Sequence, residues 1–154
     1  MADTKDSVRS LWIPLRDVNM LIPSVSVAEV SNYKVLDEVN GSPDWMLGTI
    51  SWRGETVPVI SVEVLCGDRV PVNLVYSRLM IINSIRPDSA IRFYAIVAAG
   101  LPRLVQFDDS TVRGMEVSTL EAIQCRVSVG RETAFIPDLD YIQELLEQHR
   151  DIAA

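Results

Sequence analysis

The sequence of 154 residues has few of the residue types that support metal binding or covalent catalysis. It has one histidine, His149, and two cysteines, Cys66 and Cys125, which are far apart in the chain and have no neighbouring ligand residues. This pattern indicates neither a zinc site nor a disulfide framework. We therefore expect both cysteines to be small hydrophobic thiols in a reducing compartment.

Basic residues and long apolar runs are also scarce. The chain has 21 acidic and 14 basic residues, a net charge of −7, and no basic cluster, so we expect no binding to nucleic acid. The most apolar stretch, 93–101, is far shorter than the ~20 residues that span a bilayer. The first ten residues are polar and lack the features of a signal peptide. We expect a soluble, cytoplasmic protein that does not insert into a membrane.

Enzyme motifs are missing as well. The sequence contains no G-x-S-x-G elbow, P-loop, G-x-G-x-x-G or H-E-x-x-H motif. Asp108 and Asp109 could suggest the acid pair of a phospho-receiver site, but no lysine follows Lys34, so a solvated turn is favoured. We expect no catalytic residues, no metal site and no cofactor.

What is present is a series of short apolar runs separated by Gly, Pro, Asn and Asp, which predicts a mainly β fold. The strongest hairpin signal joins strands at 49–52 and 55–65 through Arg53-Gly54. The other expected strands are at 79–82, 91–98, 104–107, 122–129 and 133–136. One helical turn is predicted at 44–47, and from Pro137 onward apolar residues at helical spacing predict a C-terminal α-helix with His149 at its end.

Two segments about 70 residues apart resemble each other. Residues 49–61 read TISWRGETVPVIS and residues 127–138 read VSVGRETAFIPD. Each combines a strand, a Gly/Arg turn, Glu-Thr and an apolar run that contains a proline. This echo predicts two similar β units. Because half of the chain is too small for a large independent core, the two units should share apolar contacts.

The turn at Arg53-Gly54 is also the best candidate for binding a partner. Trp52 and Arg53 are the residue types that most often anchor protein interfaces. The alternative is that Trp52 packs inward and Arg53 is a solvated turn residue. The valines Val25, Val27 and Val30 pose the same question, because they could belong to the core or to an apolar edge that another barrel covers.

Residues 48–60, GTISWRGETVPVI, resemble the signature of the CheW-like domain, usually G-x-x-N-x-R-G-x-x-V-P-V-I-D. Segments at 21–30, 94–97, 103–105 and 136–146 are similar to other parts of this family, in the same order. We expect the polar residues 1–10 to form a disordered tail, and the resemblance implies a single domain at 11–154. It also implies that this domain holds two interlocked, SH3-like five-stranded β-barrels around a shared core, with a C-terminal α-helix.

The resemblance further implies a non-enzymatic coupling protein of a bacterial chemosensory array. Such a protein joins the cytoplasmic tip of a chemoreceptor to the regulatory domain of a CheA-type histidine kinase. Arg53 and Gly54 match the family's R-G turn, and Val27 and Glu29 match positions on its partner-facing surface. With Trp52, these four residues form our candidate partner-binding set.

Some residues depart from the family pattern. Ser51-Trp52 stands where Asn-Leu is frequent, and Ser61 stands where Asp is usual. These departures suggest a divergent member, with a system controlling type IV pili and twitching as a hypothesis. The alternative function is a β-barrel module that binds a peptide or small ligand outside chemotaxis, which a deep pocket between the barrels would favour.

Overall fold

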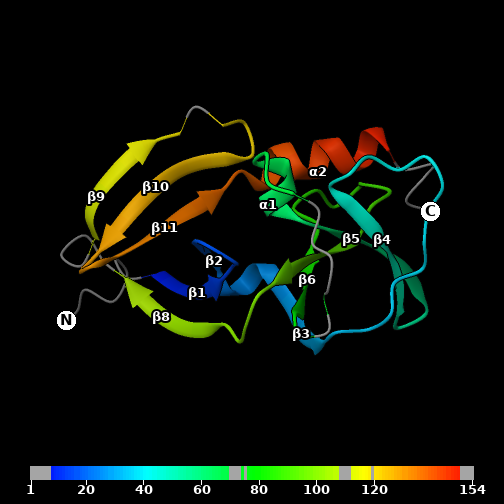
Figure 1. The fold of residues 1–154 in the computed structure, drawn as a ribbon, viewed down its shortest axis with the longest axis horizontal. Coiled ribbons are helices and arrows are strands. Elements are labelled where there is room, and N and C mark those ends of the chain that lie inside the picture. The colour runs from blue at the N-terminus through cyan, green and yellow to red at the C-terminus, as the bar shows by residue number, and fades with distance from the viewer. Residues whose placement is uncertain (1–7, 70–73, 75, 108–111, 119, 150–154) are drawn as a thin grey trace.

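The protein is described by a computed structural model that covers residues 8–69, 74, 76–107, 112–118 and 120–149. Within these residues it contains strands β1 to β11, one short 3-10 helix and two α-helices (Figure 1). Their bounds are β1 Val8–Pro14, β2 Asn19–Pro23, η2 Ser24–Ser26, β3 Val27–Asn32, β4 Met46–Trp52, β5 Glu55–Ile60, α1 Val62–Leu65, β6 Arg78–Asn83, β7 Phe93–Ala98, β8 Arg103–Phe107, β9 Val112–Val117, β10 Ile123–Val129, β11 Glu132–Pro137 and α2 Leu139–Gln148.

The strands form two sheets that lie side by side. The first sheet has six strands in the order β8-β1-β2-β11-β10-β9, and the second has five in the order β3-β6-β7-β5-β4. Each sheet contains one parallel pair, β2 with β11 in the first and β5 with β7 in the second. In Figure 1 the first sheet fills the left half and the second the right half, and α2 lies along the upper side.

The mainly β class and the C-terminal helix are confirmed, but the two sheets are not closed barrels, unlike the five-stranded SH3-like barrels that the resemblance implies. Among the described strands, each sheet runs from one edge strand to another without closing, and the first has a sixth strand. The extra strand is β9, which extends this sheet beyond β10, and the N-terminal hairpin β1–β2 lies between β8 and β11. The C-terminal sheet therefore contains two strands from the start of the chain.

Both predicted hairpins are confirmed. Arg53 and Gly54 connect β4 to β5 with φ of +47° and +78°, the positive values that a tight two-residue hairpin turn requires. The β10–β11 hairpin turns at Gly130, with φ +61°. In each hairpin the second strand also makes the parallel contact of its sheet. The two segments that resemble each other in sequence thus occupy equivalent places in the two sheets.

The predicted strand at 55–65 is wrong beyond Ile60. There Ser61 caps the short helix α1, and its hydroxyl accepts a hydrogen bond of 3.2 Å from the Val64 amide. Serine and aspartate are both good N-caps, so the usual family aspartate could fill this role too. The helical turn predicted at 44–47 is also wrong, because Met46 already begins β4. Asp108 and Asp109 lie outside the described residues.

The core is shared between the sheets, as expected. Its largest cluster combines residues from both sheets and from α2, including Ile13, Met20, Met80, Ile96 and Leu146. Helix α2 is capped by Asp138 at its start and, as predicted, by His149 at its end. Neither cysteine is in a disulfide. The first strand begins at Val8, so the last three residues of the expected N-terminal tail are part of β1, and the rest of that tail lies outside the described residues.

Candidate functional site

Trp52, the last residue of β4, packs inward. Its side chain is only 5% exposed and meets the Phe93 ring edge-on, with 4.9 Å between the ring centroids. The alternative that assigned Trp52 to the core is therefore the right one for its ring. The Trp52 ring nevertheless contacts an exposed residue, because the guanidinium carbon of Arg53 lies 4.6 Å from its centroid. Trp52 supports the next residue along the chain.

Arg53 is exposed but held in place. Its side chain is 67% exposed, and its guanidinium contacts the Glu29 carboxylate at 3.2 Å in addition to the Trp52 ring. Glu29 comes from β3, whereas Arg53 follows β4, and these are the two edge strands of the second sheet. The sheet therefore curls enough for side chains to bridge its edges, although β3 and β4 themselves are not hydrogen-bonded to each other. A stacked and paired guanidinium keeps one orientation toward solvent.

A second guanidinium extends this surface. Arg92 lies 5.7 Å from the Phe93 ring centroid and 3.6 Å from the Glu55 carboxylate. These contacts connect two arginines, two carboxylates and two aromatic rings, of which the Trp52 ring is buried beneath Arg53. We call this group the arginine–aromatic surface: Glu29, Trp52, Arg53, Glu55, Arg92 and Phe93. Sequence reasoning missed Glu55, Arg92 and Phe93. One signal for Glu55 was present in the sequence, because Glu-Thr follows the turn in both of the segments that resemble each other.

The remaining predicted site residues lie beside this surface. Gly54 completes the turn, and a side chain at this position would meet nothing within 4 Å. Val27 begins β3 but is half-buried and packs against the shared core, with a bulge separating it from Glu29. Its neighbours differ, since Val25 is 85% exposed and Val30 is also exposed. The structure thus brings together Glu29, Trp52, Arg53 and Gly54, and places Val27 at their margin.

The described residues offer little support for metal binding or catalysis. No group of three or more His, Cys, Asp or Glu side chains among them could hold a metal ion. His149 closes α2, where its Nδ1 lies 2.9 Å from the Leu145 carbonyl and its ring meets Trp45 edge-on. Burial raises the pKa of the Cys66 thiol, which disfavours the nucleophilic thiolate. None of the described helices has the length and apolar character needed to cross a membrane.

Comparison with known proteins adds to this geometry. The model of the CheW-like domain family matches residues 9–147. Among solved structures, the chain is similar to the crystal structure of the scaffolding protein TtCheW from Thermoanaerobacter tengcongensis. The TM-score is 0.70 at 15% sequence identity, and the alignment covers 85% of this chain and 88% of that one. No curated protein shows a significant match to the sequence.

Proposed function

Because this chain belongs to the CheW-like domain family, we propose that it joins the cytoplasmic tip of a chemoreceptor to the regulatory domain of a CheA-type histidine kinase. It is a coupling protein of chemotaxis signalling. In our proposal it works in the cytoplasm at the receptor array and makes or breaks no covalent bond. The alternative of a binding module unrelated to chemotaxis is not favoured, because the family match covers residues 9–147.

The observation that supports a partner site at the β4–β5 turn is the exposed, fixed guanidinium of Arg53. An exposed ion pair contributes only ~0–1 kcal/mol to folding, so the Arg53–Glu29 pair does little for stability. Arginine and tryptophan are, in contrast, frequent anchors of binding energy. A guanidinium that is already oriented loses less conformational entropy when a partner binds.

The edge strand β3 supplies the second part of the proposed surface. β3 is hydrogen-bonded only to β6 in its sheet, so its other edge is available among the described strands. Such an edge is suited to pairing with a strand or sheet of another protein. We propose that this edge, with exposed Val30, faces the kinase's regulatory domain, while the exposed surface around Arg53 receives the helical receptor tip.

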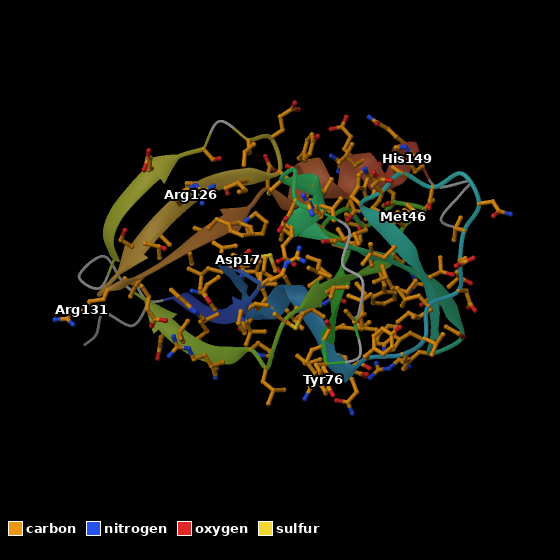
Figure 2. All side chains as sticks on the ribbon, viewed as in Figure 1. Asp17, Met46, Tyr76, Arg126, Arg131 and His149 are labelled. Carbon is orange, nitrogen blue, oxygen red and sulfur yellow. The ribbon has the colours of Figure 1, made fainter. Side chains whose placement is uncertain are left out.

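Charge reversal at Arg53 tests the site. Tagged wild-type protein, Arg53→Glu and Arg131→Glu are used to capture a CheA-type kinase and a chemoreceptor from cells of the source organism. Arg131 is a matched control because it is exposed at the turn of the equivalent hairpin, β10–β11, at the far left of Figure 2. We expect Arg53→Glu to lose the kinase, the receptor or both, and Arg131→Glu to retain them.

Both variants should melt within about 3 °C of the wild type, since surface changes of this kind cost ~1 kcal/mol or less. Retention of both partners by Arg53→Glu would reject this site. Equal loss in the two variants would also reject it, because a general charge effect would then explain the result. If wild-type protein captured neither partner, the proposed function itself would fail.

We also propose, from the departures at Ser51, Trp52 and Ser61, that the chain serves a system controlling type IV pili. A deletion strain should then lose twitching while flagellar swimming stays intact. The opposite phenotype would assign the chain to a flagellar system. Complementation with the wild-type gene is the control that ties either phenotype to this chain.

A further inference from the structure

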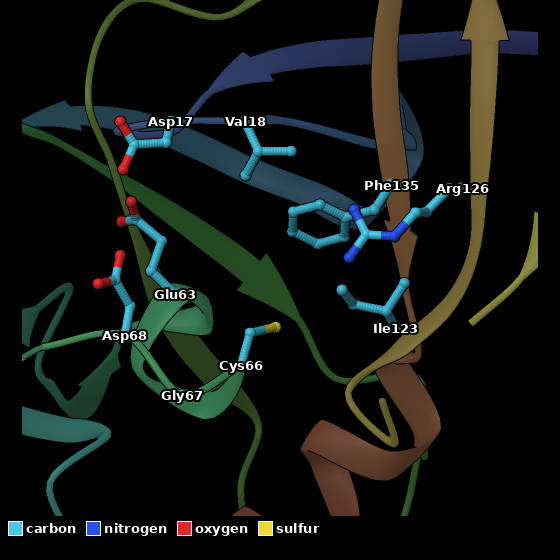
Figure 3. Close-up of a pocket in the computed structure, with 9 residues that line it drawn as sticks. All are labelled: Asp17, Val18, Glu63, Cys66, Gly67, Asp68, Ile123, Arg126 and Phe135. Atoms are coloured by element: carbon cyan, nitrogen blue, oxygen red, sulfur yellow. The ribbon is translucent and has the colours of Figure 1, made fainter. Parts of the chain in front are cut away.

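A cavity of about 370 Å³ lies beside α1, where the two sheets meet. Figure 3 shows its lining, which comes from the β1–β2 turn, from α1 and the residues that follow it, and from β10 and β11. Its middle is apolar and is formed by Val18, Ile123 and Phe135. The volume falls within the ~300–1,000 Å³ range of small-molecule sites, which are mostly apolar with a few placed polar groups. The cavity has no role in the partner surface described above.

The charged groups of this cavity are separated by sign. Asp17, Glu63 and Asp68 lie on one side, and the Arg126 guanidinium lies on the opposite side, with the apolar residues between them (Figure 3). Asp17 comes from the turn between β1 and β2, and Arg126 from β10. These residues are more than a hundred positions apart in the sequence, so the fold alone brings them to one cavity.

Two of the three carboxylates are already neutralised. The Arg16 guanidinium contacts Glu63 at 3.7 Å and Asp68 at 2.9 Å, and the Arg16 backbone amide also donates a hydrogen bond of 2.8 Å to Glu63. Asp17 and Arg126 differ, since neither forms an ion pair with any residue that the structure describes. The cavity thus presents one available carboxylate and one available guanidinium on opposite sides.

Other groups near Arg126 do not alter this pattern. Glu116 lies opposite Arg126 in the β9–β10 register and shares with it the lining of a neighbouring hollow of about 510 Å³, but the two side chains form no ion pair. The Cys66 thiol lies between the charged sides and remains protonated, because burial raises its pKa. It offers a neutral, polarisable surface to a ligand rather than a nucleophile.

We propose that this cavity binds a small zwitterionic organic molecule, with the ligand carboxylate on Arg126 and the ligand ammonium on Asp17. The planar guanidinium fork matches a carboxylate, and a carboxylate is the natural partner of an ammonium group. A ligand with a single charge would leave the other protein group unpaired. The apolar lining between them would contact the carbon atoms that join the two ligand charges.

Ligand-observed and protein-observed NMR on the purified full-length chain tests this proposal. The probes are ω-amino acids of increasing length, from glycine to 8-aminooctanoic acid. Each is compared with the alkylamine and the alkanoic acid of the same carbon number. We expect one length to bind best, and to bind roughly tenfold or more tightly than either singly charged analogue, because a charge-assisted hydrogen bond is lost in each analogue.

Equal binding of the analogues, or no binding of any zwitterion at millimolar concentration, would overturn the proposal. This comparison uses only wild-type protein, so it holds even where a variant fails to fold. Protein variants then assign the ends of the ligand. Arg126→Gln and Asp17→Asn should each weaken binding roughly tenfold, whereas Arg131→Gln, on the same hairpin but outside the cavity, should not.

Glu116→Gln, which removes a neighbouring negative charge from Arg126, should leave zwitterion binding unchanged or tighter. If Arg126→Gln and Asp17→Asn bound as tightly as wild type, the ligand would lie elsewhere and the proposal would fail. The experiment contains no kinase or receptor. Its outcome is therefore independent of the partner proposal, and Arg126→Gln should still capture the same partners as wild type.

Discussion

The substitution Gly48→Ala tests how the edge of the second sheet is covered. Gly48 has φ +153°, and a β-carbon placed there would lie 2.6 Å from the Asp37 carbonyl oxygen and 3.0 Å from the Leu36 β-carbon. These distances are well inside van der Waals contact. The segment that carries Leu36 and Asp37 lies against the outer edge of β4, so it must move away to accommodate the methyl group.

The cost can be worked from the contacts that this movement disrupts. Asp37 and Thr49 exchange two backbone hydrogen bonds, of 2.8 and 2.9 Å. Each is worth ~1 kcal/mol, and overpacking adds roughly 1–3 kcal/mol. We therefore expect Gly48→Ala to lower the free energy of unfolding by about 3–5 kcal/mol, which lowers the melting temperature by roughly 6–20 °C for a chain of this size.

Gly130→Ala is the matched control. Gly130 also has a positive φ, +61°, but a β-carbon there would meet nothing within 4 Å. Only the backbone cost of about 1–2 kcal/mol remains. Chemical denaturation compares the two variants, and hydrogen exchange should show faster exchange of the Asp37 and Thr49 amides in Gly48→Ala alone. Equal stability of the two variants, or unchanged protection of these amides, would refute the reasoning.

Two further predictions concern α2. Leu146→Ala removes a fully buried side chain that joins α2 to the shared core, and should cost about 2–5 kcal/mol in urea unfolding, whereas exposed Glu144→Ala should stay within ~0.5 kcal/mol. A hydrogen bond from the Ser89 side chain and the Arg86 guanidinium hold the pKa of Glu147 below its usual 4.5. This stabilisation is present above pH 4.5 and is lost as the pH falls through the lowered pKa, so Glu147→Gln should be less stable at pH 7 and lose less stability on acidification. If the free energies of unfolding of wild type and Glu147→Gln fell by the same amount on acidification, this prediction would be wrong.

Local signals predicted the hairpins and the terminal helix well. Arg53-Gly54 and Gly130-Arg131 mark turns because their neighbours alternate in the way that strands require. The same reasoning failed after Ile60. Val62 and Val64 alternate with polar residues, but an alternation this short also fits one turn of helix. The Ser61 cap favours the helix. Short alternations do not distinguish the two structures.

The pairing of strands that are distant in the sequence could not be predicted from local patterns. The insertion of β1–β2 between β8 and β11 depends on contacts between residues about a hundred positions apart, which no local pattern encodes. The candidate site shows the same division. Trp52 and Arg53 could be selected from the turn, whereas Phe93 and Arg92 join them only because β7 lies beside β5 in the folded sheet. Asp17 and Arg126 meet at one cavity for the same reason.

The shared core bears on how such a protein transmits a signal. Its largest cluster takes buried side chains from both sheets and from α2, so sliding one sheet past the other would disrupt close packing throughout. The β4–β5 turn and the β3 edge both belong to the second sheet, which this core supports, so partners bound at these two places would be held at a fixed relative angle. In this view the signal is a change in how each partner meets a rigid connector. Weakening the core by Leu146→Ala should then impair coupling between bound partners before it impairs the binding of either one alone.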